Sequence, residues 1–168
     1  MSAPHEAAFR AFAVMRRPSL RRTAFLLCGD WHQADDLVQA ALVKLYVAWP
    51  RIRESEPPDA YAHRVLVRCY LDERRRPWRR ESPVETVDDN AAPGRPSDDM
   101  LDLRAALARL PRRQRATLLL RFWLDASVAQ TADALGCSEG TVKSQTARAL
   151  TTLRGLLDDP QLVTEESS

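Results

Sequence analysis

The side chains best suited to specific recognition lie near the carboxyl end of the chain, between residues 138 and 148. Thr141, Ser144, Gln145 and Arg148 recur at three- and four-residue spacing, so a helix would place them on one face. Arginine pairs well with guanine and glutamine with adenine, while hydroxyl groups and lysine suit phosphates or base edges. The spacing therefore predicts a DNA-reading face. The alternative is an ordinary helical hairpin with a solvated polar face.

The residues around this face predict the turn that would position it. Residues 127–150 read SVAQTADALGCSEGTVKSQTARAL, which is the pattern of a short helix, a tight turn and a longer helix. Gly136 can adopt the left-handed conformation that closes a helix, and Ser138 is a favourable N-cap for the next one. Val142 is expected to anchor the second helix against the first. Together these features predict a helix-turn-helix.

A second basic feature is the segment RRRPWRR at residues 74–80. Its arginines suit phosphate contacts, and Trp78 could stack on a base. A solvated domain end before a linker would have the same composition, so both interpretations stay open. The preference for arginine over lysine is also ambiguous, because a GC-rich genome produces it as readily as phosphate recognition does.

The remaining reactive residue types form no catalytic or metal-binding pattern. Cys28, Cys69 and Cys137 are far apart and lack CxxC spacing, and the three histidines are equally scattered. The sequence has no Gly-rich phosphate loop and no nucleophile–base pairing. We therefore expect no enzyme activity, no cofactor and no metal, and we expect the cysteines to be small apolar core residues.

Composition favours an all-α chain. The 168 residues include only 5 glycines, and β-branched runs of strand length are missing. The 25 basic and 23 acidic residues give a net charge of only +2, so net charge by itself does not indicate nucleic-acid binding. No apolar run has the length of a signal peptide or of a membrane span of ~18 residues. This predicts a cytoplasmic protein without membrane insertion.

The chain divides into three parts, at residues 5–80, 81–100 and 101–157. The middle part reads ESPVETVDDNAAPGRPSDDM, which is rich in proline and acidic residues and poor in apolar ones. We therefore expect two small helical domains joined by an acidic flexible linker, with the helix-turn-helix in the second domain.

In the first domain, Gly29 is a plausible helix stop, and Asp30 with Gln33 resembles a capping box that opens the next helix. Pro50 is expected to end that helix, whose buried stripe comprises Leu37, Val38, Ala41, Leu42, Leu45, Tyr46 and Trp49. Another helix is expected after Pro57 and Pro58. Its predicted stripe is Ala62, Val65, Leu66, Cys69 and Tyr70, and the residues predicted to lie off it are His63, Arg64, Val67, Arg68 and Leu71.

The second domain is expected to contain helices at residues 101–110, 112–124, 127–135 and 139–157. In the first domain, Asp36, Gln39, Val43 and Lys44 fall away from the buried stripe of their helix. Acidic residues near a helix N-terminus usually compensate the helix dipole, although such a surface could also receive a basic partner.

Taken together, these segments resemble the extracytoplasmic-function group of the sigma-70 family over nearly the whole chain. Residues 35–49 resemble the region that docks on the clamp helices of the largest subunit of RNA polymerase. Residues 60–76 resemble the helix that melts and reads the minus-ten promoter element, with residues 51–57 as a loop that can capture a flipped base. Residues 101–157 resemble the domain that reads the minus-thirty-five element, and the specific motif is SEGTVKSQTARAL.

The resemblance implies an alternative sigma factor that directs RNA polymerase core to promoter DNA, with an anti-sigma factor as a further expected partner. The DNA-binding residues that it implies are Ser138, Gly140, Thr141, Lys143, Ser144, Gln145, Arg148, Tyr61, His63, Arg64, Arg68 and Arg75. The polymerase-binding residues that it implies are Asp35, Asp36, Gln39, Val43 and Lys44. It also implies that the acidic linker threads the nucleic-acid channel of the polymerase.

The chain departs from the family pattern at three positions. Many relatives have Glu at the position of Ala40, Asn at that of Arg68 and Arg at that of Gln145. The alanine weakens one expected clamp contact, Arg68 suits a phosphate better than a base, and Gln145 implies a different base preference.

Promoter geometry suits such a layout. Two elements about two helical turns apart are separated by ~70 Å, and an extended 20-residue linker could span ~66–72 Å. We expect the free protein to bind promoters poorly, because its domains are loosely tethered until polymerase fixes them. The competing hypothesis is a helix-turn-helix regulator that binds duplex DNA without polymerase.

Overall fold

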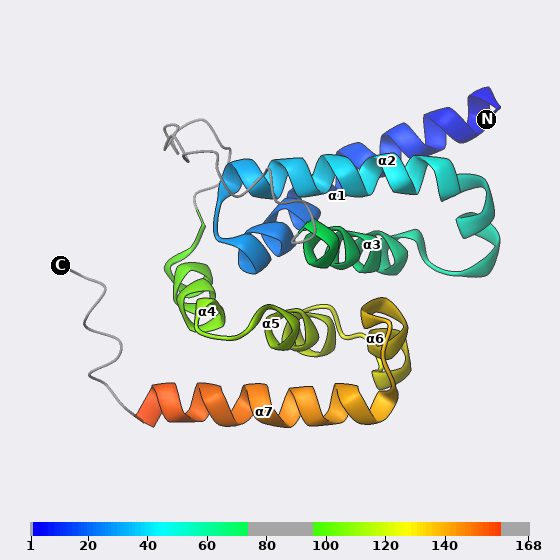
Figure 1. Cartoon of the computed structure of the whole chain (residues 1–168). Helices are drawn as coiled ribbons and strands as arrows, with labels where there is room; N and C mark the ends of the chain where they lie inside the picture. Colours follow the sequence, from blue (N-terminus) through cyan, green and yellow to red (C-terminus); the bar gives the residue numbers. More distant parts are fainter. Residues whose placement is uncertain (1, 74–95, 159–168) are drawn as a thin grey trace.

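The computed structural model describes residues 2–73 and 96–158, apart from the side chains of residues 53–55 and 157. Arg75, Trp78 and most of the predicted linker therefore lie outside the described residues. Within the described ranges the chain is helical and contains no strand, as the sequence predicted. Figure 1 shows the helices in two layers, with α1, α2 and α3 above and α4 to α7 below.

The upper layer begins with α1 (Ala3–Cys28), which ends where the sequence predicted. Gly29 takes the left-handed conformation at φ 75°, and its N–H donates to the carbonyl of Phe25. The Asp30 carboxylate then accepts hydrogen bonds from the backbone N–H groups of His32 and Gln33 and caps α2 (Trp31–Ser55). A glycine stop followed at once by an acidic cap turns the chain back, so that α1 and α2 pack together.

The prediction that Pro50 ends the second helix was wrong, because α2 continues to Ser55. A proline inside a helix removes one N–H donor and leaves the carbonyl four residues earlier without its partner. Pro50 is exposed, so water can satisfy that carbonyl, and the helix tolerates the proline. Residues 51–55 are consequently helical rather than part of the predicted loop at 51–57.

The third helix, α3 (Pro58–Glu73), is buried on more of its circumference than the sequence predicted. His63 and Val67 were expected to lie off the buried stripe, yet they are 7% and 0% exposed. The reason is that α3 packs against α1 and α2 and also against α5 and α6. A helix with neighbours on two sides needs a wider apolar surface than one stripe.

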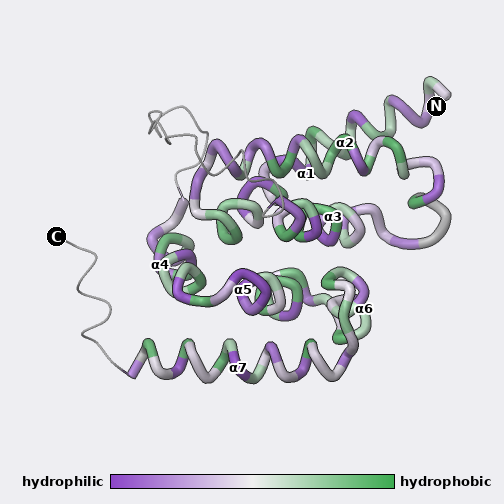
Figure 2. The backbone as a smooth tube through the Cα atoms, in the orientation of Figure 1, coloured by the Kyte–Doolittle hydropathy of each residue, from purple (hydrophilic) through white to green (hydrophobic). Residues whose placement is uncertain are grey.

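The lower layer contains α4 (Asp98–Ala108), α5 (Arg112–Leu118), a π-helical turn (Leu119–Trp123), α6 (Val128–Leu135) and α7 (Glu139–Asp158). Figure 2 shows hydrophobic and hydrophilic residues alternating along α7, as expected for a helix with one buried face. Val142 and Ala149 are fully buried, and α7 packs against α5 and α6.

The two layers are in contact, although the sequence suggested domains held together only by a tether. α1 packs against α4 and α5, and α3 packs against α5 and α6. The buried apolar residues of both layers belong to one hydrophobic cluster. The predicted boundaries at 80 and 100 fall in or beside the undescribed segment and stay predictions.

Candidate nucleic-acid interface

The turn between α6 and α7 is built by local hydrogen bonds. Ser127 and Gln130 form a reciprocal capping box at the start of α6, each side chain bonding to the backbone N–H of the other. Gly136 ends α6 at φ 64°, in the left-handed region, as the sequence predicted. The Ser138 hydroxyl accepts a hydrogen bond from the N–H of Thr141 at 3.1 Å, as an N-cap does. The capping box was missed, although Ser127 and Gln130 have the spacing that signals one.

The amino-terminal half of α7 presents polar side chains to the outside. Lys143, Ser144 and Arg148 are exposed, and Thr141 and Gln145 are half-buried. Within the described residues, no carboxylate forms an ion pair with Lys143 or Arg148. Two exposed cations within the first turns of one helix, with hydroxyl and amide groups beside them, can reach phosphates and base edges. The exposed Ser138 and Gly140 stand at the start of this surface.

The predicted DNA-reading residues of α3 differ from those of α7, because several already form hydrogen bonds within the chain. The Arg64 guanidinium donates to both carboxylate oxygens of Glu56, each at 2.6 Å. The Arg68 guanidinium donates to the carbonyls of Asp133 and Ala134 in α6. Tyr61 is half-buried, with the Arg64 guanidinium 5.8 Å from the centroid of its ring.

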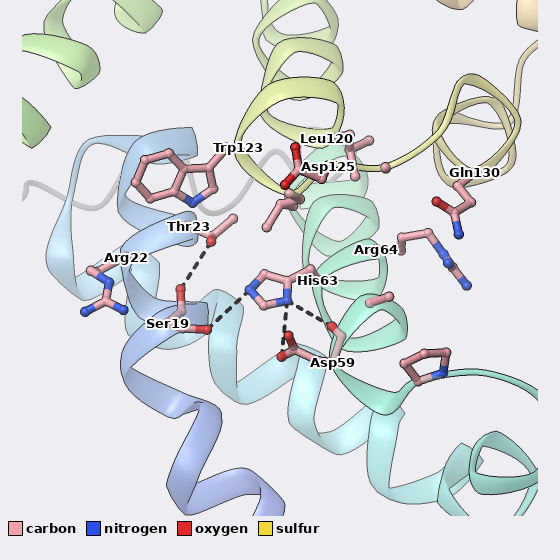
Figure 3. A pocket seen from close by; sticks show the side chains of 14 residues that line it. Ser19, Arg22, Thr23, Asp59, His63, Arg64, Leu120, Trp123, Asp125 and Gln130 are labelled. Atoms are coloured by element: carbon pink, nitrogen blue, oxygen red, sulfur yellow. Dashed lines mark hydrogen bonds and ion pairs between the residues drawn. The ribbon is translucent and has the colours of Figure 1, made fainter.

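His63 lies at the wall of a pocket of about 530 Å³ between the layers, which Figure 3 shows from close by. Its Nδ1 is 2.9 Å from the carbonyl of Asp59, and its Nε2 is 3.4 Å from the hydroxyl of Ser19. A carbonyl can only accept, so Nδ1 carries a proton in this hydrogen bond. His63 therefore does not face outward in this conformation.

Ser19, His63 and Asp59 are arranged somewhat like a nucleophile, a base and an acid, although no spacing in the sequence predicted this. The main partner of the His63 Nδ1 is the backbone carbonyl four residues earlier in its own helix, whereas the Asp59 carboxylate is 3.7 Å away. That carboxylate is also 3.5 Å from the Arg16 guanidinium. We interpret the group as the hydrogen-bonding solution for a buried histidine.

On α2, the predicted polymerase-binding residues have two kinds of surroundings, solvent or an ion pair. Asp36, Gln39, Val43 and Lys44 are exposed, with Val43 at 57%. Asp35 is instead bound by the Arg21 guanidinium, with Nε 2.7 Å from its carboxylate. This ion pair joins α1 to α2, and the Asp35 side chain is also partly exposed to solvent.

The same face of α2 carries apolar residues that sequence reasoning missed. Val47 is 70% exposed and Tyr46 is 40% exposed, although Tyr46 was expected in the buried stripe. Its ring packs edge-on against Phe9 of α1 at 5.1 Å, which leaves one side in solvent. Val43, Tyr46 and Val47 have the spacing of a single helix face, and that spacing was the available signal. We call these three residues the α2 apolar patch. Exposed apolar residues that gather on one helix face indicate an interaction surface.

Other chemistry finds little support in the described part of the chain. No group of three or more potential metal ligands occurs among residues 2–73 and 96–158. The helices of these ranges include none that is long and apolar enough to cross a membrane. Cys28, Cys69 and Cys137 are free thiols; Cys69 is buried and the other two are half-buried.

Comparison with known families agrees with the geometry of both layers. Residues 7–80 match the model of "Sigma-70 region 2", and residues 100–153 match that of "Sigma-70, region 4". The first segment covers α1 to α3, and the second covers the helix-turn-helix.

Individual relatives give the same assignment. The chain is 36% identical over 153 residues to the RNA polymerase sigma-E factor of Streptomyces coelicolor, covering 87% of this chain and 84% of that protein. It is 34% identical over 139 residues to the ECF RNA polymerase sigma factor SigM of Mycobacterium tuberculosis, covering 82% and 71% respectively.

Among solved structures, the sigma factor RpoE in complex with the anti-sigma factor NepR from Bartonella quintana is similar, with a TM-score of 0.71 and 25% identity. The match covers 91% of this chain and 98% of that chain. The two family models together span both layers, and the relatives are more than 30% identical over most of their length. These matches agree on one family. The chain belongs to the extracytoplasmic-function group of the sigma-70 family, and is an alternative sigma factor that directs RNA polymerase to promoters.

Proposed function

We propose that the two layers of this sigma factor divide promoter recognition between them. The lower layer, predicted at residues 101–157, reads the upstream minus-thirty-five element with α7. The upper layer, predicted at residues 5–80, binds the polymerase clamp with α2 and reads the minus-ten element with α3. The observation that carries this proposal is that α7 exposes Lys143 and Arg148, which pair with no carboxylate of residues 2–73 or 96–158, on a helix held by a capped turn.

The clamp contact is proposed for the face of α2 that carries Asp36, Gln39 and Lys44 together with the α2 apolar patch. An apolar centre with a polar and charged rim is the usual composition of a protein–protein contact. Ala40 is exposed beside this face. We propose that its small side chain makes a weaker clamp contact than the glutamate of many relatives would make.

For α3 we propose that Tyr61, Arg64 and Arg68 contact the minus-ten region once the layers separate. Arg68 suits a phosphate, because its positive charge attracts the backbone whatever the base sequence is. His63 was predicted to bind DNA as well. Because its side chain is buried, we propose instead that it stabilises the position of α3. Arg75 lies outside the described residues and keeps its predicted phosphate contact as a proposal.

We further propose that the protein performs no chemistry of its own and works in the cytoplasm, where polymerase and chromosome are found. An anti-sigma partner is proposed because the related RpoE was solved in complex with NepR. The acidic linker, which lies largely outside the described residues, is proposed to thread the nucleic-acid channel of the polymerase.

Transcription in vitro tests the proposal. Purified polymerase core, with and without the chain, is incubated with genomic DNA fragments, and the 5′ ends of the transcripts are mapped. We expect a set of start sites that depends on the chain and shares two sequence elements upstream. If addition of the chain produces no new start site from any fragment, the proposed function is wrong.

A further inference from the structure

The pocket in which His63 lies has room for a small ligand. Its volume of about 530 Å³ lies within the ~300–1,000 Å³ that is typical of small-molecule sites. Its wall is built by α1, by the start of α3, by the π-helical turn with the residues that follow it, and by α6. Side chains from distant parts of the sequence therefore converge on one space, as they do in binding sites between structural units.

An exposed indole forms part of this wall. The Trp123 side chain is 44% exposed, and Leu120 and Leu124 line the pocket with it. In the view of Figure 3, the Trp123 ring lies between the side chains of Arg22 and Asp125, which line the same pocket. Leaving an aromatic ring in water forgoes the free energy that its burial would yield. A planar or apolar group in the pocket would cover this ring.

Two opposite charges on the wall have no partner in the described part of the chain. The guanidinium of Arg22 comes from α1, and the carboxylate of Asp125 comes from the turn before α6. Both residues are exposed, and neither side chain forms a hydrogen bond or an ion pair within residues 2–73 and 96–158. Each is therefore free to bind a charge of the opposite sign.

The other charged side chains of the wall are already balanced. Arg64 donates to both carboxylate oxygens of Glu56, and Oδ1 of Asp59 is 3.5 Å from Nε of Arg16. This Oδ1 is buried and accepts no hydrogen bond from the described residues, so it offers an acceptor to a ligand N–H group. The pocket thus presents one free cation and one free anion, and a complementary ligand carries one charge of each sign.

The backbone at Asp125 has an uncommon conformation for a residue with a side chain. Its φ is 52°, and no other non-glycine residue of the described ranges has a positive φ. The turn closes the π-helical segment, because the N–H groups of Leu124 and Ala126 donate to the carbonyls of Leu119 and Leu120. Glycine is the usual residue at such a helix end. Aspartate there places a carboxylate on the pocket wall at a conformational cost.

We propose that this pocket binds a small zwitterion with an aromatic ring, the chemical class of aromatic amino acids and short aromatic peptides. The carboxylate of the ligand pairs with Arg22, its ammonium group pairs with Asp125, and its ring covers Trp123. An ion pair at each end fixes the orientation of the ligand, and the ring supplies the apolar contact. The site goes beyond the proposed function, because these three residues have no part in the proposed promoter and polymerase contacts.

Isothermal titration calorimetry of the full-length chain tests the site with two zwitterionic probes, L-phenylalanine and the dipeptide phenylalanyl-phenylalanine. The matched probe is the same dipeptide with an acetylated amino group and an amidated carboxyl group, which keeps the rings and loses both charges. Adenosine monophosphate and inorganic phosphate probe a site for anions only. We expect at least one zwitterion to bind with a Kd of about 1 mM or less, and the blocked dipeptide and phosphate to bind about 10-fold more weakly or worse.

Substitutions on the wall test the assigned contacts. Arg22→Gln and Asp125→Asn each remove one charge at nearly constant volume, and asparagine tolerates the left-handed conformation. Each should weaken zwitterion binding by about 10-fold, and Trp123→Leu should weaken it several-fold. The matched controls are Arg17→Gln, an exposed arginine of α1, and Phe122→Leu, a side chain that is 58% exposed; neither residue lines the pocket. Both controls should bind as the unmodified chain does.

Circular dichroism shows whether each variant keeps its helix content, and the charge-blocked dipeptide tests the same contacts on the unmodified chain. The inference is wrong if neither zwitterion binds, or if the charged and the blocked dipeptide bind equally well. It is also wrong if the pocket variants match the two controls. Binding of adenosine monophosphate or phosphate without binding of a zwitterion would assign the pocket to anions and contradict the role of Asp125.

Discussion

At the scale of single residues, the arginines of this chain have two different surroundings. Arg64, Arg68 and Arg115 are bound by carboxylates or carbonyls, whereas Arg148 is exposed and forms no ion pair among the described residues. Sequence alone could not separate them, because both kinds occur on amphipathic helices at similar spacing. The distinction decides which residue is ready to meet DNA in the free protein.

Arg148→Ala should weaken binding of the holoenzyme to promoter fragments by about 1–3 kcal/mol, roughly 5- to 150-fold, because it removes one guanidinium contact in the groove. Mobility shifts on a promoter found by start-site mapping measure this. Arg154→Ala is the control, since Arg154 is exposed on the same helix outside the predicted surface. Equal losses for the two variants would remove Arg148 from the proposed interface.

The α2 apolar patch gives a second residue-scale prediction. Val43→Asp and Val47→Asp should each weaken binding to polymerase core by about 10-fold or more, because an isolated carboxylate would be buried in the contact. Val14→Asp is a matched control, because Val14 is 71% exposed on α1 and Val47 is 70% exposed on α2. Fluorescence anisotropy of the labelled chain with core measures all three. A loss of similar size for Val14→Asp would indicate a nonspecific effect of the charge.

Cys28 offers a prediction about pH. Burial raises the pKa of its thiol from 9.0 to about 11, so at pH 8 its thiolate fraction is about 100-fold lower than that of an unshifted thiol. Alkylation of Cys28, followed by mass spectrometry, should be slower in the folded chain than in denatured chain by at least this order. Because the unfolded thiol ionises first, the free energy of unfolding should fall as pH rises from about 9 to 11. Equal alkylation rates in the two states would contradict the burial of this thiol.

At the scale of elements, the local signals predicted helix ends well where they act through short-range hydrogen bonds. Gly29, Asp30, Gly136 and Ser138 all do what their residue types predict. The failures concern the surroundings of a helix rather than its ends. Pro50 was predicted to end its helix, because the solvent exposure that lets the helix tolerate it is a tertiary property. His63 was predicted to be exposed, because the sequence does not show that α3 has neighbours on two sides.

Substituting Gly136 and Gly155 by alanine tests the effect of backbone conformation on stability without a change in packing. Gly136→Ala should lower the free energy of unfolding by about 1 kcal/mol, because φ 64° disfavours any residue with a Cβ. Gly155→Ala should raise it by up to about 1 kcal/mol, because Gly155 lies inside α7 and alanine is the better helix former. Neither added Cβ meets an atom within 4 Å. Urea denaturation of both variants measures the two changes, and the same sign for both would contradict the left-handed helix end.

At the scale of the whole molecule, the division into two helical parts could be predicted from composition, but their packing could not. Contacts such as that of Arg68 with the end of α6 join a side chain to backbone carbonyls 65 or more residues away and leave no periodic trace in the sequence. The structure packs the two layers together, whereas the sequence predicted loosely tethered domains. Weak promoter binding by the free protein is still expected, because Arg64 and Arg68 of α3 are hydrogen-bonded within the chain.

The central claim is that this chain recognises promoters as a subunit of RNA polymerase and not by itself. The most direct measurement is the mobility shift of one promoter fragment with the chain alone, with core alone and with both, at a single salt concentration. We predict a specific complex only when both are present, and its loss with the Val47→Asp variant. Tight, sequence-specific binding by the chain alone, unchanged by core, would contradict the account and support a regulator that acts without polymerase.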